Sequence, residues 1–516
     1  MTRVLLFGVD GLAFRILNPM IERGLLPNFQ RVRDEGAQGI LASTVPPMTP
    51  PSWMSISTGV SLSKHGVYDF WEYEQTAEGP RAHVLTHRKG SKAIWNILSE
   101  WGKRVVVANV PMTYPPEPVN GMMLSGYMAP DMRADVTYPG EFKQELLDAV
   151  PEYMIDLNPA VSGGQVGDPF AETLKMTQER IAMFRLLLSK TWDFCFVAFV
   201  GADRIQHLRW EKILEFHPQA VAYYQMLDEA LGMALAELKS DDVLMIVSDH
   251  GFQGAKRTFY IQEYLYKRGL LRVRDGGRRN QALFINSIKR FVQSLGLKKL
   301  ARKTMRYLRR SGVVAVEEEY HAVKLPDLDW QRTQAWVPSS SGSMAGYADI
   351  FLAESLSVES ICDLMRDLRA VRDPQTGQLL VQELYREEVY GEGAHQPGER
   401  HLVVLASESC NLATDLGRQS LWETNAAATG IHHPDGVLYL YGANVKHGVS
   451  LAPSQVYDVV PTILSRMGLP LPPELDGQVI NEAFEQPSTA ESPGEGLVLK
   501  KLKKLATSGT TGKGDY

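Results

Sequence analysis

Asp and His residues, together with one threonine, stand at or near the ends of apolar runs in this sequence. The seven residues are Asp10, Thr49, Asp203, His207, Asp249, His250 and His432. A mixed set of carboxylate and imidazole groups is typical of zinc sites, and manganese also accepts it. A hydroxyl group close to bound metal ions becomes a stronger nucleophile. The complete set therefore indicates a metal-dependent enzyme that cleaves phosphate esters.

Two pairs within this set have spacings that suit a single metal ion. Asp249 and His250 are adjacent and closely follow the apolar run 243–247. Asp203 and His207 are four residues apart, so both side chains would lie on the same face of a helix. Each pair also has an ordinary explanation, a polar turn after a strand for the first and a surface hydrogen bond for the second.

Asp10 and Thr49 are compatible with either a structural or a chemical role. Asp10 follows the apolar run 4–9, a position where a lone aspartate is often a helix N-cap. Thr49 precedes Pro50, so we expect a helix that starts at Pro50 with Thr49 as its cap. A hydroxyl at that end of a helix also lies near free N–H groups and positive potential, which favour a phosphate group.

Two further histidine positions complete the candidates. His432 is adjacent to His433, so the residues alone do not decide which of the two would bind a metal. His65 lies between Lys64 and Gly66, and we expect it to be structural or to support the ligands from behind.

The elements that would position these residues belong to an α/β fold. Strand-length apolar runs occur at 4–9, 104–110, 194–200, 243–247, 402–405 and 436–440. Segments 171–190 and 217–238 have apolar residues at helical spacing. Continuous apolar strands that alternate with helices are typical of a mostly parallel sheet covered on both faces. Ligands bind at the carboxyl ends of such strands, where Asp10, Asp203 and Asp249 fall.

The alternation of strands and helices stops after residue 254. We predict a catalytic core at 1–254 and 346–484, an insertion with basic helices at 255–345 and a disordered tail at 485–516. The insertion contains a basic stretch at 289–310. This stretch is either a solvated helical cap or a face that contacts an anionic membrane or steers a charged substrate. Residues 408–429 are polar, and we expect a loop there.

Composition argues against several classes of protein. The 516 residues carry a net charge of −6, which gives no reason to expect specific nucleic-acid binding. The 3 cysteines are too few for a disulfide framework, so we expect a cytoplasmic location. We expect no signal peptide and no membrane span, because the apolar runs are too short. The sequence does not indicate the oligomeric state.

Five motifs occur in a fixed order along the chain. They are Gly8-Val9-Asp10-Gly11, Thr49-Pro50-Pro51-Ser52-Trp53, Asp203-x3-His207, Ser248-Asp249-His250-Gly251 and Gly430-x-His432-x3-Gly436. Together they resemble the alkaline phosphatase superfamily, in particular its type I phosphodiesterase and nucleotide pyrophosphatase branch. The resemblance implies a three-layer α/β/α fold and a hydrolase that acts on a small-molecule phosphate ester.

The resemblance also implies two divalent metal ions, usually zinc. One ion would be held by Asp10, Thr49, Asp249 and His250, and the other by Asp203, His207 and His432. The motif spacing selects His432 rather than His433. Thr49 would attack the phosphorus atom, and water would then hydrolyse the phosphothreonine intermediate.

One departure from the family pattern leaves the substrate open. Many nucleotide pyrophosphatases have an asparagine shortly after the His-Gly pair, whereas Tyr68, Asp69 and Phe70 follow closely here. A nucleotide substrate is therefore undecided. Aromatic residues such as Phe70 and Tyr127 either line a specificity pocket or belong to the core.

Several other functions are also compatible with the sequence. A phosphomonoesterase or phosphomutase is one, although those branches generally use a serine nucleophile. A transferase that moves a phospho-head group at a membrane surface is another, because of the basic stretch at 289–310. A non-catalytic binding protein on the same scaffold is the third. A sulfatase is disfavoured, since no cysteine stands in a Cys-x-Pro-x-Arg segment.

Overall fold

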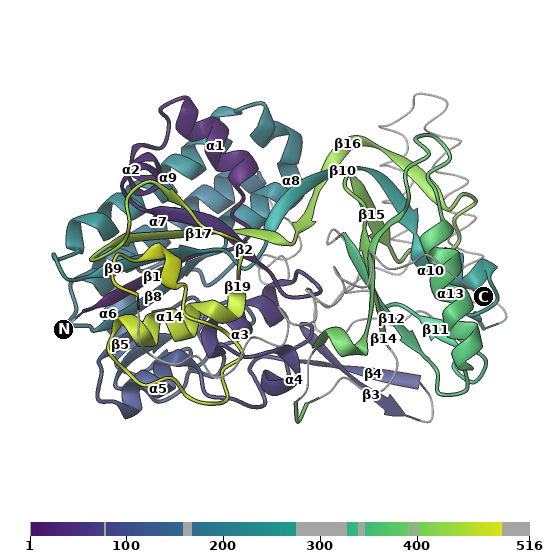
Figure 1. Ribbon diagram of the computed structural model, residues 1–516, viewed down its shortest axis with the longest axis horizontal. Helices are drawn as coiled ribbons and strands as arrows, with labels where there is room; N and C mark the ends of the chain where they lie inside the picture. Colours follow the sequence, from purple (N-terminus) through teal and green to yellow (C-terminus); the bar gives the residue numbers. More distant parts are fainter. Residues whose placement is uncertain are drawn as a thin grey trace.

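Two lobes lie side by side in the structure, a computed structural model (Figure 1). It describes residues 2–76, 79–157, 168–274, 328–338, 346–390, 393–395 and 401–487. The larger lobe contains a mostly parallel sheet, and the smaller lobe contains antiparallel strand pairs. Strands β10 (Gly251–Tyr260) and β16 (Trp422–His433) run from one lobe to the other.

The sheet of the larger lobe has the strand order β18-β2-β17-β9-β1-β8-β5-β6-β7, with β19 paired to β2. Its strands are β1 (Val4–Val9), β2 (Ala37–Ala42), β5 (Val105–Ala108), β6 (Gly121–Leu124), β7 (Thr137–Tyr138), β8 (Phe194–Phe199), β9 (Val243–Val247), β17 (Asp435–Gly442), β18 (Val449–Ser450) and β19 (Ser454–Gln455). Strands β9, β1, β8, β5 and β6 are parallel, whereas β17 is antiparallel to both of its neighbours. The predicted α/β fold with a mostly parallel sheet is confirmed.

Helices cover both faces of this sheet, because successive side chains of a strand point in opposite directions. Leu5, Phe7 and Val9 of β1 pack on one side and Val4 and Leu6 on the other. The first side is covered by α1 (Phe14–Glu22), α2 (Pro27–Glu35), α6 (Phe142–Ala149), α7 (Pro169–Leu188), α8 (Gly201–Leu214) and α9 (Pro218–Glu237). The second is covered by α3 (Thr49–Thr58), α5 (Ile94–Glu100) and α14 (Val459–Arg466). The result is three layers, as predicted.

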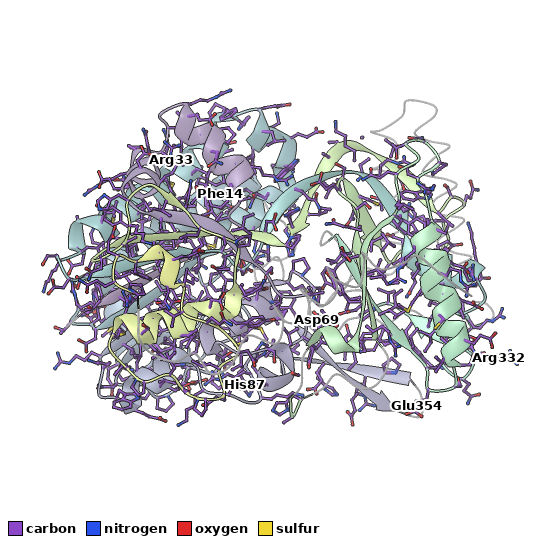
Figure 2. All side chains as sticks on the ribbon, viewed as in Figure 1. Phe14, Arg33, Asp69, His87, Arg332 and Glu354 are labelled. Carbon is purple, nitrogen blue, oxygen red and sulfur yellow. The ribbon has the colours of Figure 1, made fainter. Side chains whose placement is uncertain are left out.

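The smaller lobe has a hydrophobic core of its own. Its four-stranded sheet has the order β11-β12-β14-β13, and a three-stranded sheet has the order β15-β10-β16. The elements are β11 (Ala335–Trp336), β12 (Tyr347–Leu352), β13 (Val381–Arg386), β14 (His401–Ala406), β15 (Cys410–Ala413), α10 (Ile261–Lys267) and α13 (Val358–Ala370). A hairpin of β3 (Trp71–Thr76) and β4 (Gly79–Val84) packs against it through Tyr73. Figure 2 shows Asp69, just before this hairpin, at the junction of the lobes.

Three local predictions are wrong. Residues 408–429, expected as a loop, contain β15 and much of β16, whose exposed polar side chains hide the pairing with β10. The run 402–405 is a strand as predicted, but it lies in β14 of an antiparallel sheet and not in the mostly parallel one; β14 is central in that sheet and therefore as apolar as a parallel strand. The helix expected from Pro50 begins at Thr49, and Met48 is its N-cap.

The division of the chain into core and insertion remains a prediction. Strands at 347–352 and 401–406, placed in the core from the sequence, share the smaller lobe's core with α10 and Leu271. We propose that this lobe is larger than the predicted insertion at 255–345. The basic stretch 289–310 and the tail from 488 lie outside the described residues. Among the described residues, no helix is long and apolar enough to cross a membrane.

Candidate metal centre

The candidate ligands meet at the carboxyl edge of the central strands. Asp10 directly follows β1, and α8, which follows β8, carries Asp203 and His207. Asp249 and His250 lie between β9 and β10. Since β1 pairs with both β8 and β9 in parallel, these strand ends lie beside one another. The antiparallel pairing of β16 with β10 returns the chain to the same place, and there His432 is paired with Phe252.

Asp10, Asp249 and His250 form the first group of candidate ligands. His250 Nε2 is 3.2 Å from Asp249 Oδ2 and 3.7 Å from Asp10 Oδ1. Thr49 Oγ1 is 3.4 Å from the same nitrogen. All four side chains are buried. The hydroxyl at the start of α3 therefore lies beside a group that could hold one cation.

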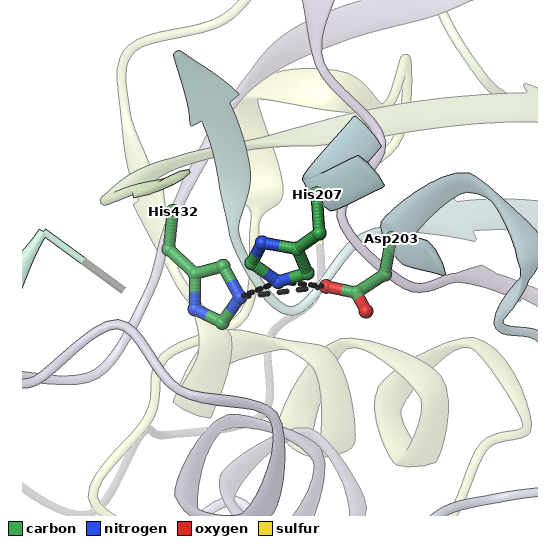
Figure 3. Close-up of side chains that lie close together, drawn as sticks. All are labelled: Asp203, His207 and His432. Atoms are coloured by element: carbon green, nitrogen blue, oxygen red, sulfur yellow. Dashed lines mark hydrogen bonds and ion pairs between the residues drawn. The ribbon is translucent and has the colours of Figure 1, made fainter. Parts of the chain in front are cut away.

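Asp203, His207 and His432 form the second group (Figure 3). Asp203 Oδ1 is 3.2 Å from His207 Nε2 and 3.4 Å from His432 Nε2, and the two nitrogens are 3.0 Å apart. The His432 ring stacks on the His250 ring of the first group with centroids 3.7 Å apart. The two groups are therefore direct neighbours, and the structure brings all seven predicted residues together.

Backbone carbonyl oxygens orient all three imidazoles. Each histidine Nδ1 lies within hydrogen-bond distance of one such oxygen. The pairs are His207 with Gly430 (3.0 Å), His432 with Pro47 (2.8 Å) and His250 with Gly251 (3.1 Å). A carbonyl oxygen only accepts, so each Nδ1 donates this hydrogen bond, and Nε2 is the ring atom that faces the carboxylates. This arrangement is usual for histidines that bind a metal.

Each of the three carboxylates has one oxygen held by a donor. Asp10 Oδ2 accepts from Trp53 Nε1 (3.1 Å), Asp249 Oδ1 from the Gly11 N–H (3.0 Å) and Asp203 Oδ2 from Arg204 Nη1 (2.7 Å). The second oxygen of each carboxylate is buried and has no hydrogen-bond partner among the described residues. These oxygens are the ones that face histidine Nε2 atoms. Buried acceptors without a donor are costly, and a cation in each group would satisfy them.

Burial controls the protonation of this centre. It raises the pKa of Asp10, and the charges of Asp249 and Asp203 raise that pKa further. Burial also raises the pKa of Asp249. Burial would raise the pKa of Asp203 as well, but His207, His432 and the Arg204 charge hold it well below its usual value. Burial lowers the pKa of both His250 and His432, which favours the neutral rings that bind metals.

Comparison with known proteins assigns the chain to a family. A model of the type I phosphodiesterase/nucleotide pyrophosphatase family matches residues 4–332. The chain belongs to this family. It is a phosphoester hydrolase, as predicted, and metal dependence is typical of the family. A search among curated proteins gives no match.

Solved structures share the fold. Phosphonoacetate hydrolase from Sinorhizobium meliloti, in complex with phosphonoacetate, is similar with a TM-score of 0.56 and 16% identity, over 89% of this chain and 94% of that chain. Its complex with phosphonoformate gives a TM-score of 0.57 and 15% identity, over 89% and 94%. An inactive murine ectonucleotide pyrophosphatase/phosphodiesterase 5, in complex with AMP, gives 0.51 and 13%, over 92% and 96%.

The structure shows which histidines of this phosphodiesterase-family chain lie among the candidate ligands, a question that the residues alone left open. His432 lies beside Asp203, whereas His433 Nδ1 accepts from the Asp435 N–H at 3.1 Å. His65, at the end of the short helix α4 (Leu62–His65), is fully buried. Its Nε2 is 3.0 Å from Ser55 Oγ and its Nδ1 accepts from the Val67 N–H. Burial lowers the pKa of His65 to about 3, so its ring is neutral, and these two contacts do not involve the candidate ligands.

Sequence reasoning missed the residues of this family member that support the candidate ligands. Trp53 lies within a quoted motif, but nothing in its type indicates a hydrogen bond to Asp10. Arg204 is adjacent to Asp203, and that adjacency was the available signal. Asp156, which binds Arg204, gave no signal because 47 residues separate it from Asp203 in the chain. Phe252 packs edge-on against the His207 and His432 rings.

Proposed function

We propose that the protein is a two-metal phosphodiesterase or pyrophosphatase that works through a phosphothreonine intermediate. One observation carries this proposal: three buried carboxylates each direct an oxygen without a hydrogen-bond partner among the described residues toward imidazole Nε2 atoms, next to the Thr49 hydroxyl. One ion would be held by Asp10, Thr49, Asp249 and His250, and the other by Asp203, His207 and His432. The mixed oxygen and nitrogen set favours zinc, and manganese is compatible with it.

Bound divalent cations supply Lewis-acid stabilisation of the charge that develops on the attacking and leaving oxygens. The Thr49 hydroxyl gives up its proton to solvent and Oγ1 forms a bond to phosphorus as the ester P–O bond opposite breaks, and the leaving alkoxide takes up a proton from solvent to become the alcohol. Water then cleaves the Oγ1–P bond, which restores Thr49 and releases the phosphate product. Pro50 and Pro51 carry no N–H and the Ser52 N–H is bonded to the Met48 carbonyl, so the Thr49 N–H and the positive end of the α3 dipole are what favour the phosphoryl oxygens there.

The charge of the centre supports an anionic substrate. Two divalent cations would carry more positive charge than the carboxylates of Asp10, Asp203 and Asp249 cancel. The excess attracts a phosphate group into a buried site, where electrostatic interactions are stronger than in water. The similar solved structures hold phosphonoacetate and AMP, which supports a small phosphoryl compound as substrate here.

The contact that many nucleotide pyrophosphatases make with an asparagine is replaced in this chain. Phe70 stands close to that place, and its ring packs edge-on against Tyr127 with centroids 5.3 Å apart. The Phe70 ring cannot donate the hydrogen bond of an amide. The phosphoryl oxygens would instead depend on the helix N-terminus and the cations, which leaves the organic group of the substrate open.

Replacement of Thr49 by alanine tests the mechanism. Bis-aryl and mono-aryl phosphates, nucleotide sugars and phospholipid head groups would be assayed with zinc or manganese added. We expect Thr49→Ala to lose at least about a thousandfold in kcat, since a nucleophile acts as a unit with its neighbours. Acid quench of the wild type with labelled substrate should trap label on Thr49.

Thr58→Ala is the matched control, because Thr58 lies in the same helix and its hydroxyl donates only to the Met54 carbonyl, at 2.7 Å. It should retain turnover. Wild-type turnover by Thr49→Ala would remove Thr49 as the nucleophile. Faster turnover of mono-aryl than bis-aryl phosphates would favour a phosphomonoesterase instead.

A further inference from the structure

We propose that Arg204 is a positioning residue of the metal centre, which fixes the carboxylate of Asp203 so that one oxygen alone faces the cation. This inference rests on the proposed two-metal function. A set of contacts holds the guanidinium against the Asp203 oxygen that does not face the two histidines.

Arg204 occupies one oxygen of Asp203. Its Nη1 donates to Asp203 Oδ2 at 2.7 Å. The other oxygen, Oδ1, lies 3.2 Å from His207 Nε2 and 3.4 Å from His432 Nε2 and has no hydrogen-bond partner in the described structure. Because a charge-assisted bond holds Oδ2, the carboxylate cannot rotate without breaking it. Asp203 is thereby set as a ligand through Oδ1.

Asp156 holds Arg204 from the opposite side. Arg204 Nη2 donates to Asp156 Oδ2 at 2.5 Å and Nε donates to Asp156 Oδ1 at 3.2 Å. Two parallel bonds between a guanidinium and a carboxylate fix the plane of the guanidinium, which an ammonium group cannot do. The guanidinium also lies over the Tyr127 ring, 4.5 Å from its centroid. Tyr127 in turn contacts Phe70.

Regular elements of the larger lobe anchor this arrangement. Ile155, next to Asp156, accepts a hydrogen bond through its carbonyl from Arg180 of α7. Arg180 also donates to the Ala198 carbonyl of β8 at 2.9 Å, and its side chain is almost fully buried. The segment that carries Asp156 is therefore tied to the strand that precedes α8. A rigid support of this kind is what a ligand needs to hold a fixed direction.

Arg204 should affect mainly one of the two proposed ions. Arg204 contacts Asp203 but none of Asp10, Asp249 or His250 through the hydrogen bonds and ion pairs of the described residues, although its charge acts on Asp10 without such a contact. Loss of the guanidinium should therefore weaken the ion held by Asp203, His207 and His432 far more than the other. Removal of a group that orients a ligand typically costs 10–100-fold in metal affinity.

The experiment measures zinc binding to the metal-free, full-length protein by competition with a chromophoric chelator. Wild type should bind two ions. Arg204→Gln should bind one ion as wild type does and the second about 10–100-fold more weakly. Arg204→Lys should recover part of that loss, because an ammonium can still reach Asp203 but cannot form the paired contact with Asp156. Arg209→Gln is the control, since Arg209 is exposed on the same helix and donates to the Leu208 carbonyl.

Cobalt substitution gives a second readout that a general loss of stability would not mimic. The visible spectrum of cobalt in one site should change in Arg204→Gln while that of the other site stays the same. Thermal unfolding of the metal-free variants checks folding. If Arg204→Gln does not fold, Asp156→Asn is the deciding variant. It keeps the bond from Arg204 to Asp203 and removes the carboxylate that holds Arg204 from the other side. We then expect a smaller loss of affinity for the same ion.

Two results separate the failure of this inference from that of the proposed function. Wild-type affinity for both ions in Arg204→Gln, or in Asp156→Asn where that variant decides, would overturn the positioning role and leave the two-metal proposal intact. Equal weakening of both ions would also overturn it. Fewer than two bound ions in the wild type would instead overturn the proposed function, on which the inference depends.

Discussion

Replacement of Trp53 by phenylalanine tests how far Asp10 depends on its hydrogen-bond donor. Trp53 Nε1 donates to Asp10 Oδ2 at 3.1 Å, and both side chains are buried. Phenylalanine keeps an aromatic ring but removes the donor and leaves a small void. An orphaned, buried acceptor and the lost ring atoms together cost about 2–4 kcal/mol of unfolding free energy. Guanidinium unfolding of the metal-free protein would measure this change.

The same variant should also bind zinc more weakly. The bond to Oδ2 leaves Asp10 Oδ1 facing His250 Nε2, at 3.7 Å. A freely rotating carboxylate loses that direction, so we expect about a 10–100-fold lower affinity for one ion. Competition with a chromophoric chelator would measure this zinc affinity, as in the experiment on the Arg204 variants.

Trp95→Phe is the matched control for this pair of effects. Trp95 is buried on the same side of the sheet, and its Nε1 donates to Glu117 Oε2 at 3.0 Å. Glu117 Oε2 keeps its bonds from Arg88 and Asn96, so this variant should lose the ring atoms and less stability than Trp53→Phe, and it should keep wild-type zinc affinity. If Trp53→Phe also kept wild-type zinc affinity, the claim that Trp53 orients Asp10 would be refuted.

Two further predictions concern pH. Burial raises the pKa of Asp10 and Asp249, so the metal-free protein loses unfolding free energy as pH rises through those raised values. Zinc should release protons from these carboxyl groups when it binds and should restore the lost stability. Calorimetry in buffers of different ionisation enthalpy measures the protons released, and zinc binding without proton release would contradict the prediction. Burial and the charge of Asp69 raise the pKa of Asp349 from 3.8 to about 7. The protein therefore has its full unfolding free energy from this group below pH 3.8, the pKa in the unfolded chain, and loses that contribution as pH rises through 7. Asp349→Asn, which keeps an acceptor for the Tyr390 hydroxyl, should be more stable than wild type above pH 7 by about 3 kcal/mol and equal at pH 4; equal stability at both pH values would contradict this.

The central fold could be predicted because its strands are continuous apolar runs. Strands β1, β8 and β9 are buried on both faces, and α7 and α9 follow the 3.6-residue period closely. The strand β16 could not be predicted, since its exposed polar side chains resemble a loop and only its pairing with β10 makes it a strand. Local composition does not report a partner that lies about 170 residues away.

The candidate site could also be predicted only in part from the sequence. Asp10, Asp203 and Asp249 could be placed together because parallel strands end at one edge. The donors that hold them could not, because Trp53 and Arg204 act through side-chain geometry that spacing does not encode. The backbone carbonyls that orient the histidines, such as that of Pro47, carry no residue-type signal whatever.

The strands that join the two lobes have a consequence for any attempt to remodel this protein. Strand β10 starts immediately after His250, and β16 carries His432 near its end, before the chain re-enters the central sheet at β17. The smaller lobe is thus inserted between two candidate ligands and is not an independent module. Excision at its base would take His432 away, whereas an exchange of surface turns at its far end would leave the ion-binding geometry untouched. Engineers who wish to alter substrate choice should therefore graft loops onto this lobe and keep its two connecting strands intact.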